Sequence, residues 1–178
     1  EQYSTIGLAP TIAMHKDVAE KVIPKGITTT SLKDLIFKND LILGKSTERS
    51  YGQHVDKIIL RIPKDDMIIR AGKDSLQSLT YMLLKKRVDL IIGYPGEHLY
   101  LQSKLKKESQ FIQLQISESP KTVLGFIGCN QSKESEQFLK KADISLSMIK
   151  ASPEYASLML RWVPKNLQQN FVNELNNQ

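Results

Sequence analysis

A short apolar strand that follows an amphipathic helix is the feature that most constrains how this chain can fold. The expected strand, residues 89–93, is too short and too continuously apolar for a helix, and Gly93 and Pro95 end it. The segment before it has apolar residues at helical spacing, after Asp74 or Ser75 as an N-cap. These apolar residues are Leu76, Leu79, Met82 and Leu83. A helix leading into a strand buried on both faces is typical of parallel α/β sheets.

Tyr94 directly follows the end of this strand. In open α/β sheets, ligands bind beyond the carboxyl ends of the strands. Tyr94 is therefore a candidate for ligand contact by stacking or hydrogen bonding. The alternative is that its ring packs against Pro95.

The composition favours a globular protein over a nucleic-acid-binding or membrane-spanning one. Of 178 residues, 40% are hydrophobic and 25% are charged, with a formal net charge of +6. The densest basic clusters, at 85–87 and 104–107, contain no aromatic residue for base stacking, so we expect no nucleic-acid partner. No run approaches the roughly 20 apolar residues of a membrane span, so we expect none in this chain.

Sequence motifs for catalysis and for metal binding are missing. The single cysteine excludes an intrachain disulfide and a cysteine-rich zinc site. His15, His54 and His98 do not have metal-binding spacing, and no P-loop, dinucleotide fingerprint or nucleophile elbow is present. We therefore expect no metal and no cofactor, and an enzyme is a less favoured function for this chain.

Two kinds of organisation follow one another along the chain. Helices and strands alternate up to Cys129, with central strands expected at 41–43, 67–70 and 89–93. From Ser132 onward only helices are expected, and their apolar stripes need a surface to cover. The stripes include Phe138, Leu146, Leu158 and Trp162, so some apolar surface of the tail is expected to be uncovered.

Five segments together resemble the later part of a bacterial extracellular solute-binding protein of family 3, with the type II periplasmic binding protein fold. They are residues 31–35, 49–52, 72–94, 123–129 and 153–163. The resemblance runs from about Pro10 to about Pro164. It is nearest to an uncharacterised branch that has an Arg-Ser-Tyr-Gly turn and a Tyr-Pro after the strand.

The resemblance implies a chain that starts in lobe one, crosses to lobe two and returns. Residues 15–120 would form a complete α/β lobe two. Residues 1–14 and 121–178 would supply hinge strands near Ala13 and Leu124 and the C-terminal helices of lobe one. The N-terminal part of lobe one is then expected to be missing here, with a signal peptide upstream.

The family also implies a function. The protein would be periplasmic or extracellular, and it would capture a small polar or anionic solute between two lobes by hinge closure. Besides the solute, its partner would be a membrane transporter or a sensor. The alternative is the ligand-sensing domain of a signalling protein with the same fold.

The candidate ligand-binding residues lie in turns at the ends of strands and the starts of helices. Arg49 offers a bidentate contact to an anion, and Ser50 offers an N-cap with neighbouring amides. The alternative is that Ser50 only caps its helix and Arg49 is solvated. Glu48 and Glu97 are possible acceptors, although Glu97 is expected to be only a first-turn helix acid. The expected set is Arg49, Ser50, Tyr51, Gly52, Asp74, Ser75 and Tyr94.

One departure from the family pattern bears on the ligand. Amino acid binders of this family place an acidic residue after the strand that ends here at Gly93, where this chain has Tyr94. That acid holds the amino group of the ligand. We therefore expect a less zwitterionic solute than an α-amino acid.

Overall fold

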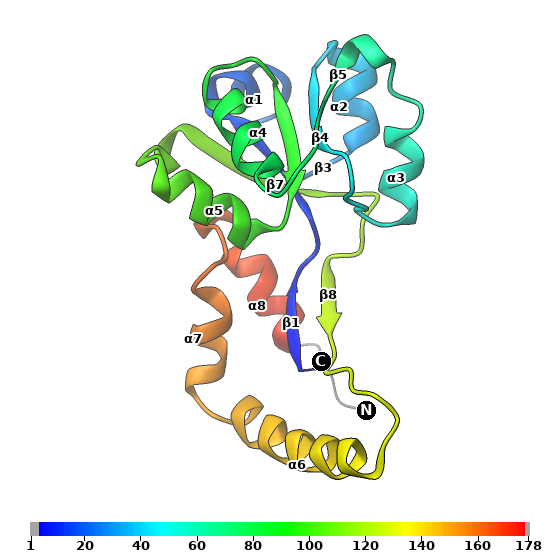
Figure 1. Ribbon diagram of the computed structural model, residues 1–178. Coiled ribbons are helices and arrows are strands. Elements are labelled where there is room, and N and C mark those ends of the chain that lie inside the picture. The colour runs from blue at the N-terminus through cyan, green and yellow to red at the C-terminus, as the bar shows by residue number, and fades with distance from the viewer. Residues whose placement is uncertain (1–3, 177–178) are drawn as a thin grey trace.

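The computed structural model describes residues 4–176 and has two parts (Figure 1). The upper part is an α/β lobe around a six-stranded sheet, and the lower part is formed mainly by helices. Two long extended segments, which contain β1 (Thr5–Leu8) and β8 (Thr122–Gly125), connect them. The mixed α/β class expected from the sequence is confirmed.

The sheet of the upper lobe has the strand order β3-β7-β2-β6-β4-β5. In that order the strands are β3 (Thr29–Thr30), β7 (Phe111–Ile116), β2 (Thr11–His15), β6 (Leu90–Gly93), β4 (Leu43–Ser46) and β5 (Met67–Arg70). β6, β4 and β5 are parallel, as are β3 and β7, whereas β2 runs antiparallel to both of its neighbours. The first strand of the sheet in the sequence is therefore one of its central strands.

The expected buried strand at 89–93 is confirmed as β6, and its pattern has a clear physical cause. Leu90 and Ile92 belong to the apolar core on one face of the sheet, and Ile91 belongs to the core on the other face. Because helices cover both faces, every side chain of this strand is buried. A continuous apolar run is the sequence pattern that such a position requires.

Two other strand predictions need correction. The strand expected at 41–43 begins only at Leu43, because the amide of Ile42 donates to the Asp89 side chain at 2.8 Å instead of joining the ladder. The strand at 67–70 is an edge strand rather than a central one, and Ile69 on it is exposed. β2 and β7 take the central positions instead.

Five α-helices flank this sheet. They are α1 (Lys16–Val22), α2 (Leu32–Asn39), α3 (Gln53–Ile59), α4 (Ser75–Leu84) and α5 (Pro95–Lys104), with short 3-10 turns η1 (Lys64–Asp66) and η2 (Glu108–Gln110). Residues of α1, α2 and α3 share one apolar core, whereas residues of α4 share the other. This three-layer arrangement leaves the carboxyl ends of the parallel strands free to carry a site.

The chain enters the sheet at Thr11, before the lobe boundary expected at residue 15. Ala13, near which a hinge strand was expected, is fully buried in β2 between β6 and β7, and the position of a hinge stays a prediction. The connecting segments are residues 9–10 and 117–121, and the Ala9 amide donates to the Lys121 carbonyl at 3.2 Å. Leu124 lies in β8, which pairs antiparallel with β1. Of the ranges expected for lobe one, residues 1–3 and 177–178 lie outside the described chain.

The lower part contains α6 (Lys133–Lys150), α7 (Glu154–Leu160), η3 (Lys165–Leu167) and α8 (Gln168–Asn176). α8 packs against β1 through a separate apolar core (Figure 1). The buried members of this core are Ile6, Leu8, Val163, Leu167 and Phe171. Asn170 also ties α8 to the upper sheet, because its side-chain amide donates to Gln115 Oε1 at 2.8 Å.

The apolar stripe of the tail is largely uncovered, as expected. Phe138, Leu158 and Trp162 are 53%, 58% and 48% exposed, and Leu146 is half-buried. Within the described chain, α6 has no buried residue. None of the helices described here is long and apolar enough to cross a membrane.

Candidate ligand-binding site

A cavity of about 230 Å³ lies where β4 and β5 end and α4 begins. Its lining residues come from the β4–α3 turn, the β5–α4 turn and the first turn of α4: Ser46, Thr47, Glu48, Arg49, Gly72, Lys73, Ser75 and Leu76. The carboxyl edge of a parallel sheet is where ligands of α/β proteins bind. The cavity is therefore the candidate ligand-binding site.

Backbone and hydroxyl hydrogen bonds hold the two turns together. The Thr47 amide donates to the Arg70 carbonyl at 2.9 Å, and the Thr47 hydroxyl donates to the same oxygen at 3.1 Å. Gly72 has φ +93°, a conformation that L side chains rarely adopt, and this lets the chain turn sharply from β5 toward α4. The two turns that line the cavity are thus fixed to the ends of β4 and β5.

Ser46 and Ser75 form the polar base of the site. The Ser75 hydroxyl donates to Ser46 Oγ at 3.0 Å, which joins the last residue of β4 to the first residue of α4. Asp74 is the N-cap residue, as expected, but makes no side-chain cap hydrogen bond among the residues described. The N-terminus of α4 therefore points its helix dipole at the cavity without a carboxylate cap from Asp74.

Arg49 is engaged with Glu97 in a bidentate ion pair. Arg49 Nη1 donates to Glu97 Oε2 at 2.6 Å and Nη2 donates to Oε1 at 2.5 Å. Glu97 Oε2 also accepts from the Tyr94 amide at 3.2 Å. The hydrogen bond with Arg49 lowers the pKa of Glu97, and the same bond raises the pKa of Arg49. Glu97 is thus more than a first-turn helix acid, because it connects α5 to the β4–α3 turn.

This ion pair brings the two predicted parts of the site together. Arg49 follows β4 and Tyr94 follows β6, and β4 and β6 are neighbouring parallel strands. Tyr94 is 45% exposed and stands at the N-cap of α5, so its ring is available for contact. A role of Arg49 or Tyr94 in ligand binding stays a prediction, and an anion at Arg49 would have to compete with Glu97.

Ser50 is not the N-cap of α3, and this expectation is wrong. The helix starts at Gln53 after Gly52, whose φ is +98°. The Ser50 hydroxyl donates to Asp56 Oδ2, and the Tyr51 amide donates to Asp56 Oδ1 at 2.9 Å. Asp56 therefore holds the turn in place from within the helix, and a positive φ at the start of the helix selects Gly52.

Tyr51 belongs to the apolar core and not to the rim of the cavity. It is 4% exposed and packs with the residues of α2 and α3. Burial raises the pKa of its hydroxyl. Tyr51 was expected in the site because residues 49–52 resemble the ligand-binding turn of the family.

Ser46 and Lys73 line the cavity, although neither belongs to the expected set of ligand-binding residues. Ser46 was expected in the polar turn after a strand that ended at residue 43, whereas it is the last residue of β4. The polar pair Ser46-Thr47 after an apolar run was the signal that could have placed the strand end correctly. In residues 4–176 no group of three or more His, Cys, Asp or Glu side chains is arranged to hold a metal ion.

No family model matches this sequence, and no curated protein matches it by sequence. Several solved structures match its fold. An ancestral cationic amino acid solute-binding protein matches at a TM-score of 0.59 and 15% identity over 92% of this chain and 61% of that protein. The periplasmic binding protein XoxJ from Methylobacterium extorquens AM1 matches at 0.55 and 13% identity, over 99% of this chain and 68% of that one.

EhuB in complex with hydroxyectoine matches at a TM-score of 0.52 and 21% identity, over 99% of this chain and 61% of that protein. The chain thus spans about 61% of the length of two of these three proteins. At such low identities the likeness speaks to the fold alone. The α/β lobe, the paired connecting strands and the helical tail are arranged as in type II periplasmic binding proteins.

Proposed function

We propose that this chain takes part in capturing a small polar or anionic solute at the carboxyl edge of its sheet. The observation that carries the proposal is the cavity at the ends of β4 and β5, where Ser46 and Ser75 meet at the N-terminus of α4. Hydroxyl groups and helix amides bind carboxylate or phosphate oxygens without a buried formal charge. Lys73 on the cavity wall adds positive charge for the same purpose.

Hinge closure is the mechanism that the two connecting segments favour. Residues 9–10 and 117–121 run side by side between the upper lobe and the β1–β8 pair (Figure 1). Few residues would need to change φ and ψ for the two parts to rotate. A solute held on the sheet edge would then be covered from the other side, which excludes water and strengthens its polar contacts.

Proteins of similar fold support a solute-binding role in general terms. EhuB is described in complex with hydroxyectoine, and ancestral arginine-binding proteins are described bound to glutamine and to arginine. By this analogy we propose a periplasmic or extracellular location and a membrane transporter as partner. Tyr94 replaces the acidic residue of amino acid binders, which favours a solute without a free α-amino group.

A ligand screen by thermal shift on the full-length protein tests the proposal. Amino acids, organic acids and zwitterionic compatible solutes are compared, and a true ligand at 100 times its Kd stabilises the folded state by about 2.7 kcal/mol. Lys73→Gln and Ser75→Ala should weaken binding of the selected ligand. Lys38→Gln is the matched control, because Lys38 pairs with Asp34 on α2 and does not line the cavity.

The outcome that contradicts the proposal is equally clear. No stabilisation by any solute class, or an affinity that Lys73→Gln and Ser75→Ala leave unchanged, would remove the cavity as the binding site. Product formation is followed in the same samples, because one matching protein is described as a precursor of cyclohexadienyl dehydratase. Turnover of a bound compound would replace the binding role by a catalytic one.

A further inference from the structure

A second cavity, of about 450 Å³, lies between α3 and the segment that connects β7 to β8. We call it the cationic groove and define it by His54, Lys57, Ile58 and Arg61 on α3 and Ser117 and Ser119 on the connecting segment. It has no lining residue in common with the candidate ligand-binding site. Any ligand of the groove would therefore be separate from the proposed solute.

Three basic side chains line the α3 wall of the groove. His54, Lys57 and Arg61 are spaced three and four residues apart, so they lie on one face of the helix and its C-terminal turn. In the described chain, residues 4–176, none of the three forms an ion pair with an acidic side chain. Lys57 and Arg61 thus bring two unneutralised charges to one cavity, where an anion would lower their mutual repulsion.

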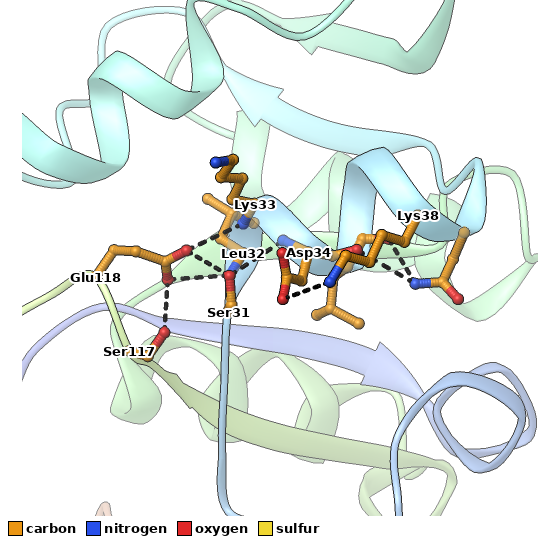
Figure 2. Close-up of polar contacts among 9 residues, drawn as sticks. Ser31, Leu32, Lys33, Asp34, Lys38, Ser117 and Glu118 are labelled. Carbon is orange, nitrogen blue, oxygen red and sulfur yellow. Dashed lines mark hydrogen bonds and ion pairs between the residues drawn. The ribbon is translucent and has the colours of Figure 1, made fainter.

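Glu118 is the acidic residue that lines this groove, but its carboxylate is used elsewhere (Figure 2). Oε1 accepts from the Ser31 hydroxyl at 2.6 Å and from the Lys33 amide at 3.2 Å, and Oε2 accepts from the Leu32 amide at 3.1 Å. The Ser117 hydroxyl donates to Oε2 at 3.0 Å. With both oxygens directed at the N-terminus of α2, Glu118 is not the counter-ion of the α3 cations.

The opposite wall offers a hydroxyl group that the protein leaves unused. Ser119 Oγ is buried and makes no hydrogen bond with any part of the chain that the structure describes. A buried donor without an acceptor is costly, at roughly the desolvation free energy of the group. Ser119 also lines a neighbouring cavity beside α8, and a rotation of its side chain toward the groove would let an anionic oxygen accept from this hydroxyl.

We propose that the cationic groove binds a small dianion, either a phosphate group or a dicarboxylate, between α3 and the β7–β8 connection. Arg61 presents a planar fork that matches the oxygens of both groups, and Lys57 supplies a point charge beside it. Ser119 donates from the opposite wall. Ile58, between the cations, provides an apolar surface for the short carbon skeleton of an organic dianion.

Isothermal titration of the full-length protein with inorganic phosphate, succinate and acetate tests the proposal at a constant ionic strength set with chloride. Phosphate or succinate should bind more tightly than the monoanion acetate, and the stronger of the two identifies the ligand chemistry. Lys57→Gln and Arg61→Gln should each weaken that binding by roughly tenfold. Lys140→Gln, an exposed cation on α6 outside both cavities, is the matched control and should change nothing.

Two results would overturn the proposal. One is that neither dianion binds more tightly than acetate, and the other is that Lys57→Gln and Arg61→Gln behave as Lys140→Gln does. Lys73→Gln separates this proposal from the solute site. It should leave dianion binding unchanged, whereas a loss of dianion binding in that variant would place the dianion in the candidate ligand-binding site instead.

Discussion

The Glu118 carboxylate accepts a hydrogen bond from the Ser31 hydroxyl at 2.6 Å, although the two residues are 87 positions apart in the sequence. Ser31 is the N-cap of α2, and Glu118 lies in the segment that leaves the sheet for β8 (Figure 2). Partial burial alone would raise the pKa of Glu118, but the hydrogen bonds from Ser31 and the α2 amides together lower it. This contact joins a helix start to a connection between the two parts.

Glu118→Gln should lower the free energy of unfolding by about 1 kcal/mol at pH 7. The loss is this small because the Glu118 side chain is partly exposed and solvent screens its interactions. Because the folded-state pKa of Glu118 is depressed, its contribution is present above the unfolded-state pKa and is lost as pH falls through the folded-state pKa. Urea unfolding of both proteins from pH 7 to pH 3 measures this difference. Glu174→Gln, which breaks only the surface pair with Lys121, should cost less, and an equal loss in both variants would contradict the prediction.

His98 should make the protein less stable in mild acid. His98 lies on α5 with its ring fully buried, and burial lowers its pKa to about 4. In the unfolded chain this histidine binds a proton near pH 6.5, whereas in the folded chain it does so only near pH 4. The free energy of unfolding therefore decreases by about 3 kcal/mol as the pH falls from 6.5 to 4. His98→Leu should remove this slope from the pH dependence of urea unfolding, and the same slope in the variant would assign it to another group.

Gly44 should not tolerate a methyl group. A Cβ at this position of β4 would lie 2.8 Å from Leu79 Cδ2 and 2.9 Å from Ile91 Cγ2, both of them core side chains. Gly44→Ala should therefore destabilise the protein by about 1–3 kcal/mol through overpacking. Gly7→Ala in β1 is the control, because a Cβ there meets no atom of the described chain within 4 Å. Thermal unfolding compares the two, and equal melting temperatures would contradict the packing argument.

Phe171 and Phe138 should respond differently to truncation. Phe171 is fully buried in the core between α8 and β1, whereas Phe138 is 53% exposed on α6. Phe171→Ala should cost about 3–5 kcal/mol and Phe138→Ala less than about 1 kcal/mol. Denaturant titration of the isolated chain measures both. A large loss from Phe138→Ala would mean that the α6 face is covered in solution.

Arg49 and Glu97 offer a test of how an anionic solute is held. If Arg49 contacts the solute, Glu97 competes for the same guanidinium fork. Glu97→Gln should then raise the affinity for an anionic solute, and Arg49→Gln should lower it. Titration of the ligand selected by the thermal-shift screen measures both, and parallel changes in the two variants would remove Arg49 from the site.

Strand positions were predicted correctly from the sequence where burial alone determines the residue pattern. β6 was placed correctly because burial on both faces leaves a continuous apolar run. β4 was misplaced because its start is decided by the Ile42–Asp89 hydrogen bond, which joins residues far apart in the chain. In addition, the last two residues of β4, Lys45 and Ser46, are polar, so the apolar run ends before the strand does.

The residues of the candidate site likewise divide into those that local sequence patterns place and those that tertiary packing places. Ser75 and Arg49 were placed at the correct edge of the sheet because strand ends and helix starts leave local patterns. The burial of Tyr51 and the pairing of Arg49 with Glu97 depend on how α3 and α5 approach the sheet. Such approaches are set by tertiary packing, which a single sequence read locally does not encode.

The central position of β2 has a consequence for how the chain folds. β2 is made before the other strands of its sheet, yet its two neighbours, β6 and β7, lie far downstream in the sequence, after β3, β4 and β5. Loops of that size must close before the ladder forms, so the contact order is high and folding is expected to be slow. Until residue 116 has left the ribosome, both edges of this apolar strand lack their native partners, and a chaperone that shields strand edges would act in that interval.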